Sequence, residues 1–396
     1  MISVEYKEAA RRVEIQVEET PKLWPQEKCP QCARQAVGGY DHVPERTWRH
    51  LNVCQLGAVI RCQLPRGQCK SCQHVYQVKP PWEGRSKHFT QEFEGFALTL
   101  MREMPVKKAG QILGETDQRL WRMLMAHVWA AYRELNMENV VWIGADEMNR
   151  RKGHNYLTVF ADLIQRRVLF ATEGKDAATW QAFVDELVKH NGHPKAIQQA
   201  AIDMSPSYIR GVKDNLGNAA IVFDKFHVVS QVNEGVEQVR RLEAQSQQSL
   251  AKTQWIWRKN PDHWTEKESR RWEQLDRQNL ATGLAYQMRL VLQDIYQEEK
   301  PSRARQRFQD WCQWIRDKAA QGASVLMAPM VKVANMVENH LEGILAHWKK
   351  ELTTAFLEGL NSLFSATKRK ARGYRSSEYL ITMLYFVAGK LRIPCY

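Results

Sequence analysis

Two cysteine pairs place the strongest constraint on how this chain can fold. Each pair has the spacing C-x2-C, and 36 residues separate the second cysteine of the first pair from the first cysteine of the second. Four thiolates complete the tetrahedral shell of a structural zinc ion, so we predict one zinc site with the ligands Cys29, Cys32, Cys69 and Cys72. Free or redox-active thiols are the alternative interpretation. Residues of the same region that could replace one ligand are Cys62 above all, and Cys54, His42, His50 and His74.

The net charge favours a polyanionic partner. The chain of 396 residues carries 57 Lys+Arg against 44 Asp+Glu, a formal charge of +13. Nucleic acid is the commonest partner of so basic a protein, and a basic surface that only confers solubility is the alternative. No apolar run approaches the ~18 residues of a membrane span, and the N-terminus lacks the apolar stretch of a secretory signal. We therefore expect a cytoplasmic protein with no membrane partner.

A helix-turn-helix is predicted after the cysteine region. Pro105 can begin a first helix, residues 114–117 have the composition of a turn, and a second helix follows from Asp117. In DNA-binding motifs of this kind, side chains at the start of the second helix reach base edges and phosphates. We assign that role to Gln118, Arg119 and Arg122. A plain helical linker with a solvated charged face is the alternative.

The middle of the chain has the pattern of an α/β sheet. Apolar runs predict three strands, then a helix, a strand, a second helix and a last strand. The predicted strands are 140–146, 156–163, 167–172, 197–202 and 219–223.

Acids at the strand ends form the candidate catalytic site. Asp146 and Asp203 each follow an apolar run, and they become neighbours if the first and fourth strands lie side by side. Converging carboxylates suit magnesium or manganese, and a pair of such ions supports phosphodiester chemistry. Glu358 is the candidate third acid, because helical spacing places it on one polar face with Asn361 and Arg369. An ordinary surface glutamate is the alternative at that position.

Other acids compete for the same role. Glu147 alternates to the opposite face of its strand from Asp146. Asp162 ends the second strand and is expected to point elsewhere. Asp224 follows the last strand, where it can bind metal, orient His227 or cap the next helix. We keep Asp224, His227 and Asn361 as supporting residues.

The last third of the chain is predicted to be helical and then basic. Residues 234–350 contain 7 of the 14 tryptophans, and helix breaks are expected near Pro261, Pro301 and Pro329. This block suits a dimer or DNA-end surface, and packing in an ordinary core is an equal alternative. A final helix at 351–375 runs into a tail in which residues 365–396 carry seven Lys+Arg against one acid. We assign phosphate contacts to Lys368, Arg369, Lys370, Arg372 and Arg375.

An ordered set of motifs resembles the insertion-sequence transposases of the ISL-three family, which have an RNase H-like DDE catalytic domain. The set spans nearly the whole chain, and it is far more specific than any one motif. One departure precedes Glu358, where the chain reads LTTAFL and the family more often has Asn-Gly. The matching stretches are CPQC with RGQCKSC, IGADE with RKGHNY, AIDMS with Tyr208, DKFHVV, and EGLN with KRKARGY.

The resemblance implies specific roles for these residues. Asp146, Asp203 and Glu358 would be the catalytic acids and would hold magnesium or manganese. Asp203 and Glu358 are 155 positions apart, and the segment between them would contain a helical insertion. Arg151 and Lys152 follow the first acid, and we include them among the DNA-binding residues.

We therefore expect a multidomain DNA transposase with an N-terminal zinc-binding region, a helix-turn-helix, and an α/β RNase H-like catalytic domain interrupted by a mostly α-helical insertion. It should bind terminal inverted repeats and target DNA as a homodimer at the prokaryotic nucleoid. The alternatives are a domesticated, non-catalytic DNA-binding regulator and a structure-selective nuclease. The expected domains are 1–87 (zinc-binding), 88–138 (helix-turn-helix), 139–233 (catalytic domain, first part), 234–350 (helical insertion) and 351–396 (last catalytic helices and basic tail).

Overall fold

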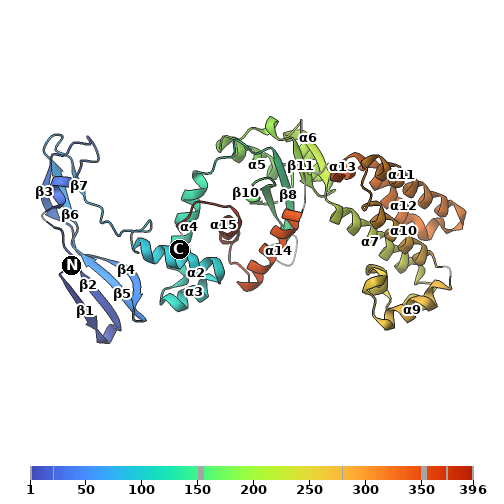
Figure 1. Cartoon of the computed structure of the whole chain (residues 1–396), viewed down its shortest axis with the longest axis horizontal. Helices are drawn as coiled ribbons and strands as arrows, with labels where there is room; N and C mark the ends of the chain where they lie inside the picture. The colour runs from blue at the N-terminus through green and yellow to red at the C-terminus, as the bar shows by residue number, and fades with distance from the viewer. Residues whose placement is uncertain are drawn as a thin grey trace. The chain divides into compact units, whose positions relative to one another are not determined.

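The chain forms two compact units, Met1–Leu135 with Ser362–Tyr396 and Asn136–Asn361 (Figure 1). None of the described helices combines the length with the apolar character that crossing a bilayer requires. The computed structural model describes residues 2–20, 22–149, 156–278, 280–348, 355–371 and 373–394, without the side chains of 149, 322–324, 355–358 and 361.

The first unit begins with two small sheets. One has four strands in the order β1-β2-β5-β4, with β2 and β5 parallel and the other neighbours antiparallel. The other has three antiparallel strands in the order β3-β6-β7, and a four-residue helix α1 lies beside it. The elements are β1 (Ser3–Lys7), β2 (Arg12–Gln16), α1 (Leu23–Gln26), β3 (Val37–His42), β4 (Arg46–Val53), β5 (Leu56–Cys62), β6 (Pro65–Cys69) and β7 (Val75–Gln77).

Three helices follow, and the last two have the positions predicted for the helix-turn-helix. They are α2 (Gln91–Glu103), α3 (Val106–Leu113) and α4 (Asp117–Arg133). The Thr90 hydroxyl caps α2 by accepting from the backbone N–H of Phe93 at 3.2 Å. Helix α3 ends at Gly114, whose φ of +69° is the left-handed conformation that favours glycine.

The end of the chain packs on this helical group. Helix α15 (Ser377–Ala388) is largely buried, and its Tyr379 ring stacks on Trp121 of α4 with the centroids 4.4 Å apart. The Tyr385 ring of α15 packs on Tyr132 of α4 with the centroids also 4.4 Å apart, but tilted by 30°. The expected basic tail therefore contains an apolar helix, and it belongs by its contacts to the first unit. Before it, α14 (Ala355–Lys370) contributes residues to both units.

A five-stranded mixed sheet is the centre of the second unit, and all five predicted strands are confirmed. Its order is β10-β9-β8-β11-β12. Strands β8, β9 and β10 form an antiparallel meander, whereas β11 and β12 run parallel to β8. The strands are β8 (Trp142–Asn149), β9 (Tyr156–Asp162), β10 (Arg167–Glu173), β11 (Gln199–Ile202) and β12 (Ala220–Phe223).

Two helices pack together beside this sheet, α5 (Ala177–Lys189) and α6 (Pro206–Asn215). Phe160 of β9 stacks on Phe183 of α5 with the centroids 4.2 Å apart. Trp180 of α5 meets Tyr208 of α6 edge to face at 5.6 Å. These buried rings fix the helices on one face of the sheet.

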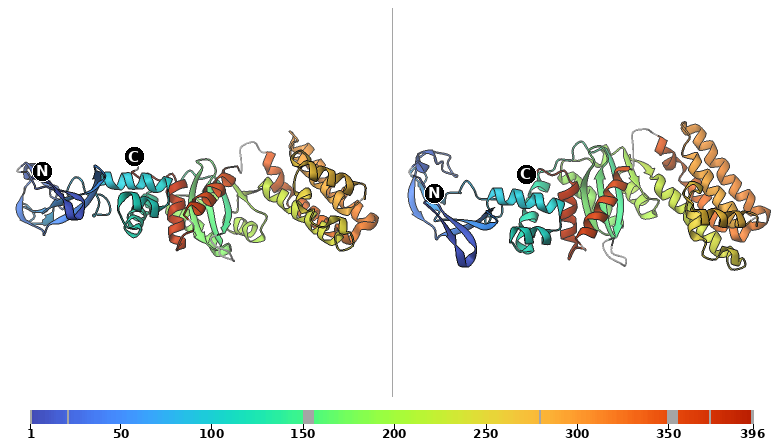
Figure 2. Two further views of the ribbon diagram at one scale, coloured as in Figure 1. Left: turned by 90° about the horizontal axis from the view of Figure 1, so that it is seen from below. Right: turned by 60° about the horizontal axis from the view of Figure 1, so that its bottom comes forward.

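The described residues from 225 to 348 are helical, as predicted, and their larger helices lie side by side (Figure 2). Trp257 and Trp311 are buried, as expected if the tryptophans of this block pack in an ordinary core, whereas Trp255 is exposed.

The break predicted at Pro329 is wrong, because α12 continues through it. Pro329 removes only the bond to the carbonyl of Val325, an exposed residue in the first turn of α12. The helices are α7 (Lys225–Glu243), α8 (Gln254–Arg258), α9 (Glu266–Asp276), α10 (Ala281–Ile295), α11 (Pro301–Lys318), a π-helical turn (Ala319–Ala323), α12 (Ser324–Asn339) and α13 (Leu341–Leu345).

We predict that Gly211→Ala destabilises the second unit. A Cβ at this position of α6 would overlap the Trp180 indole, which is fully buried. Such overpacking costs about 1–3 kcal/mol of unfolding free energy. Urea unfolding followed by tryptophan fluorescence measures the change. Gly217→Ala is the matched control, because a Cβ there meets no atom within 4 Å; equal stability of the two variants would contradict the prediction.

Candidate functional site

The four predicted cysteines converge on one point of the first unit. Their sulfur atoms all lie within 4.8 Å of one another. The Sγ atoms of Cys29 and Cys72 are 3.6 Å apart, as are those of Cys32 and Cys69. A tetrahedron with metal–sulfur bonds of about 2.3 Å has edges of about 3.8 Å, so the cluster fits a zinc ion. Among the described residues it is the only group of its kind.

The two cysteine pairs are held by equivalent turns. Ala33 donates its N–H to the carbonyl of Cys29 at 2.8 Å, and Gln73 donates to that of Cys69 at 2.9 Å. Ala33 and Gln73 both have left-handed backbone angles, with φ of +60° and +59°. A hydrogen bond from the backbone N–H of Cys72 lowers the pKa of the Cys69 thiol to about 6. This turn therefore favours the thiolate, which is the form that binds zinc.

The alternative ligands lie elsewhere or make other contacts. Cys62 is buried in a separate cluster with Trp48 and Leu64, and burial raises the pKa of its thiol. Cys54 is exposed. The three histidines have other partners: His42 faces Glu19, His50 bonds the Thr90 hydroxyl and His74 stacks on Tyr76.

The start of α4 presents two of its three assigned polar side chains to solvent. Gln118 and Arg122 are exposed. Arg119 is instead held by the fold, since it pairs with Glu115 at 2.6 Å and lies over the Phe89 ring at 4.7 Å. The i,i+4 spacing of Glu115 and Arg119 was the signal in the sequence for this pairing.

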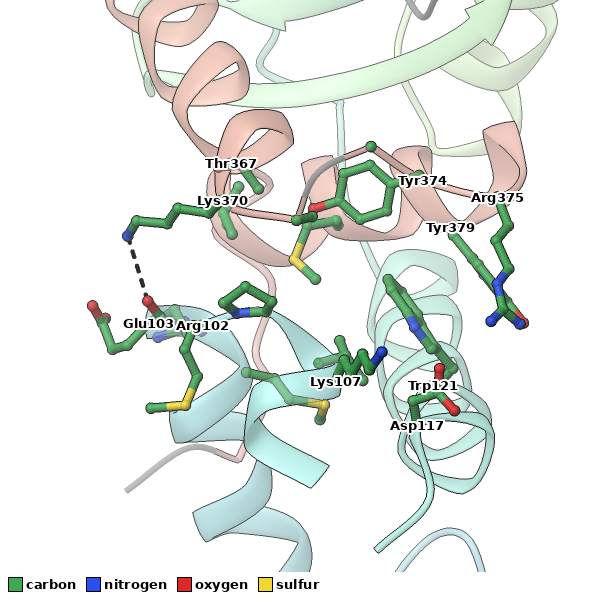
Figure 3. Close-up of a pocket in the computed structure, with 18 of the residues that line it drawn as sticks. Arg102, Glu103, Lys107, Asp117, Trp121, Thr367, Lys370, Tyr374, Arg375 and Tyr379 are labelled. Carbon is green, nitrogen blue, oxygen red and sulfur yellow. Dashed lines mark hydrogen bonds between the residues drawn. The ribbon is translucent and has the colours of Figure 1, made fainter. Parts of the chain in front are cut away.

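A cavity of about 390 Å³ opens beside the start of α4, within the first unit (Figure 3). The end of α2, the starts of α3 and α4, the last turns of α14 and the segment before α15 line it. Its cations include Lys107, Lys370 and Arg375, and Lys370 donates to the Glu103 carbonyl at 3.4 Å. The sequence analysis did not include Lys107 among the candidate DNA-binding residues, because no local motif contains it. Its position just after Pro105, at the start of α3, was the only signal for such a role.

The two candidate acids lie on neighbouring strands of the five-stranded sheet. Asp203 follows the end of β11, as predicted, but Asp146 lies within β8, where it pairs with Val159, because β8 continues to Asn149. Ala201 of β11 pairs with Gly144 of β8 in a parallel register. Continuing that register by two residues sets Asp203 beside Asp146, on strands about 4.8 Å apart. The same continuation from the pairing of β11 with β12 sets Asp224 on the other side of Asp203.

Glu147 and Tyr208 lie within the electrostatic field of both acids. The pKa of Glu147 is raised chiefly by burial; Lys175, 3.8 Å away, opposes the shift, and the charges of Asp203 and Asp146 add to it. Burial also raises the pKa of Tyr208, and the same three acids contribute. Like charges held this close repel one another, and a bound cation relieves the repulsion.

The remaining acids have local structural roles. Asp224 is buried and caps α7 by accepting from the N–H of Phe226 at 2.9 Å, which is one of the three roles considered for it. Asp162 accepts from the backbone N–H groups of Ile164 and Gln165 and so stabilises the β9–β10 turn. The His227 ring is half-buried and meets Phe226 edge to face at 6.3 Å.

Several assigned residues fall outside what the structure describes. Glu358 and Asn361 belong to α14, but their side chains lie outside the described residues. Arg151, Lys152 and Arg372 lie outside them altogether. Of the other basic residues of α14, Arg369 is exposed and Lys368 is half-buried.

The chain matches three family models along its length. A transposase family matches residues 143–384, the helix-turn-helix domain of transposase family ISL3 matches 78–128, and the zinc-finger of transposases IS204/IS1001/IS1096/IS1165 matches 25–72. The three matches follow the order zinc site, helix-turn-helix and sheet found in the structure.

Curated relatives are similar over nearly their whole length. The chain is 26% identical over 381 residues to the transposase for insertion sequence element IS1001 of Bordetella parapertussis, covering 94% of this chain and 91% of that protein. It is 24% identical over 392 residues to the transposase for insertion sequence element IS1557 of Mycobacterium tuberculosis, covering 90% and 84%.

We predict that Cys69→Ser removes zinc and unfolds the N-terminal region. Zinc binding by four thiolates is coupled to the folding of such a site. Elemental analysis after purification without chelators measures the metal, with one zinc per wild-type chain expected. Cys54→Ser is the matched control, since that thiol is exposed and outside the cluster. Zinc-free wild-type protein with a folded N-terminal region would show that the cluster is not a zinc site.

Proposed function

Because the chain belongs to the ISL3 family of transposases, we propose that it binds the terminal inverted repeats of its insertion sequence and cuts and joins DNA strands through a DDE triad. The triad is Asp146, Asp203 and Glu358. The observation that carries this proposal is the parallel β8–β11 register, which aligns the first two acids on neighbouring strands. Both relatives named above are transposases of insertion sequence elements.

The sheet supports an RNase H-like assignment for the catalytic domain. An antiparallel meander is followed by two strands parallel to β8, in the order β10-β9-β8-β11-β12. The helices after β12 then form an insertion before the helix that carries Glu358. From the sequence and the family match to residues 143–384, we propose a catalytic domain at 139–233 and 351–396 and an insertion at 234–350. Of these residues, 362–396 pack within the first compact unit.

The three acids would hold magnesium or manganese. The fit rests on the donor set, since Asp146 and Asp203 are half-buried carboxylates and the charges of both act on Glu147. When bound, such ions activate the attacking hydroxyl or water and stabilise the leaving oxygen. The protein holds the carboxylates in place: Asp203 accepts from the N–H of Ser205 at 2.9 Å, and Asp146 accepts from that of Glu147 at 2.7 Å. Asp224, His227 and Asn361 act as positioning residues.

Sequence recognition is assigned to the exposed face of α4. Gln118 and Arg122 would contact base edges, and Arg119 would support the turn through Glu115. Phosphate contacts come from Arg151 and Lys152 and from the basic end of α14 and its following segment. Those last residues are Lys368, Arg369, Lys370, Arg372 and Arg375.

Two DNA ends must be held together for transposition, so we propose a homodimer on the paired ends and target DNA. Its place of action is the cytoplasm, at the nucleoid. Zinc folds the N-terminal region, which then presents the helix-turn-helix to the DNA end.

We predict that Asp146→Ala, Asp203→Ala and Glu358→Ala each abolish cleavage of end DNA in magnesium while binding persists. The acids act as one unit, so double variants should be no worse than single ones. Cleavage of a labelled fragment carrying the element's ends measures this. Asp185→Ala is the matched control, an exposed acid of α5 that should keep full activity.

Asp224→Ala separates the proposed triad from its nearest competitor. We expect a partial loss of cleavage, because the variant loses the cap of α7. Full activity in Glu358→Ala together with complete loss in Asp224→Ala would contradict the triad. End binding without cleavage by the wild type would favour the non-catalytic regulator.

We predict that Lys370→Ala/Arg375→Ala flattens the salt dependence of end binding. Each lost phosphate contact lowers the slope of log K against log salt by about one, so the expected change is about two. Gln118→Ala/Arg122→Ala should instead reduce the preference for end DNA over unrelated DNA. Fluorescence anisotropy across a salt series distinguishes the two effects. An unchanged slope in the first variant would mean that these cations only line the cavity.

A further inference from the structure

We propose that the loop 84–88, just before α2, is a second DNA contact that holds the phosphate backbone through Arg85 and Lys87. Neither residue belongs to the helix-turn-helix face or to the basic end of α14. The inference rests on the proposed end binding and adds to it a site that positions DNA without reading its sequence.

The loop is a closed turn with a fixed backbone. Gly84 donates its N–H to the carbonyl of Phe89 at 2.9 Å, and Glu83 pairs with Thr90 in an antiparallel bridge. Lys87, near the tip, has a left-handed backbone with φ of +59°. A lysine in that conformation is uncommon, and the surrounding contacts must hold it there.

A buried carboxylate holds the loop from below. Glu94, in the first turn of α2, is 2% exposed. It accepts from the backbone N–H groups of Arg85 at 2.8 Å and Ser86 at 2.9 Å, and also from the Ser86 hydroxyl. His127 of α4 contacts the same carboxylate at 2.7 Å. Burial alone would raise the pKa of Glu94, but the bonds from His127 and Ser86 lower it, so the carboxylate stays charged.

Glycine is required where the loop crosses this carboxylate. A Cβ added at Gly84 would overlap the carboxylate carbon and both oxygens of Glu94. The absence of a side chain at position 84 therefore lets the loop approach the Glu94 carboxylate closely, and this approach fixes the position of Arg85.

A second buried carboxylate holds the loop from the side. Glu83 accepts from the Trp48 indole N–H at 3.1 Å and from Arg46 at 3.0 Å. Arg46 also donates to the carbonyl of Lys87 at 2.9 Å. The loop is thus fixed to β4 on one side and to α2 and α4 on the other.

The cations at the tip are left available. Arg85 and Lys87 are exposed, and neither forms an ion pair with any residue in the described part of the chain. The arginines of the neighbouring strands differ, since each of them is matched with a carboxylate. Those residues are Arg46, Arg49, Arg61 and Arg66.

The loop borders a cavity of about 750 Å³ in the first unit. Lys79, Arg85 and Lys87 supply three cations to its lining, and Gln77 and Gln91 supply neutral hydrogen-bonding groups. The acids of the lining, Glu83 and Glu94, already accept the hydrogen bonds described above. A concave surface with unmatched cations and satisfied acids is complementary to phosphate groups.

DNA is the polyanion that the position favours. The loop leads directly into α2, and the Glu94–His127 contact links it to α4, the helix assigned to base recognition. Both elements lie in the same compact unit, and the buried Glu94–His127 contact fixes the loop relative to α4. A phosphate contact beside the recognition helix would set the register of the protein on the duplex.

The test is Arg85→Ala/Lys87→Ala in the full-length protein, with duplex binding measured across a salt series. We expect the affinity for end DNA and for unrelated DNA to fall by the same factor, about tenfold at moderate salt. The slope of log K against log salt should flatten by about two, because two phosphate contacts are lost. Arg166→Ala/Lys195→Ala is the matched control: it removes the same two charges, both exposed, one of them in a left-handed position. An unchanged slope in the loop variant, or an equal change in the control, would overturn the proposal.

Gly84→Ala tests whether the loop must be held in place. The variant keeps both cations but displaces the backbone from Glu94, so we expect its affinity for DNA to fall. Its zinc content and the thermal unfolding temperature of the rest of the unit should stay unchanged. Wild-type affinity in a folded Gly84→Ala variant would contradict a fixed contact. The proposed function is judged separately, by the preference of the wild type for end DNA and by cleavage in Asp146→Ala.

Discussion

The parallel pairing of β8 with β11 determines where the acids of this protein can act. Asp146 and Asp203 are 57 positions apart in the chain, and no local interaction brings them together. A parallel neighbour needs a crossover connection, which the β9–β10 hairpin and α5 supply here. The pairing also holds like charges on neighbouring strands against their repulsion, and the buried aromatic packing of α5 and α6 stabilises the sheet that does so.

Buried carboxylates play the corresponding part in the first unit. Glu83, Glu94 and Glu115 each join elements that are separate in the chain, and each is satisfied by cations, N–H groups or a histidine. Leaving such a charge unpaired would cost several kcal/mol, so the positions of its partners are strongly fixed. The contacts proposed for DNA therefore rest on a framework of buried carboxylates whose hydrogen bonds and ion pairs are already made within the protein.

Sequence reasoning succeeded where function follows from local spacing or from a short apolar run. The cysteine pairs and the five strands of the sheet are of this kind. It failed to see Glu94, because its partners Arg85, Ser86 and His127 lie 9, 8 and 33 positions away and only the fold unites them. It also misjudged Pro329, since the cost of a proline depends on how close to the helix start it falls. The catalytic role of Glu358 stays a prediction from spacing and resemblance.

The end of the chain illustrates how composition conceals structure. Seven Lys+Arg in residues 365–396 suggest a solvated basic tail, yet Leu380, Leu384 and Tyr385 are almost fully buried. The apolar residues are concentrated in α15, and the cations precede and follow it. Because α15 packs on α4 through the stacked Tyr379 and Trp121 rings, Lys370 and Arg375 are held near the start of α4 rather than on a free segment. The charge that composition spreads along the tail is thus concentrated beside α4, where an ordered cation loses less entropy on meeting a phosphate than one on a mobile chain would.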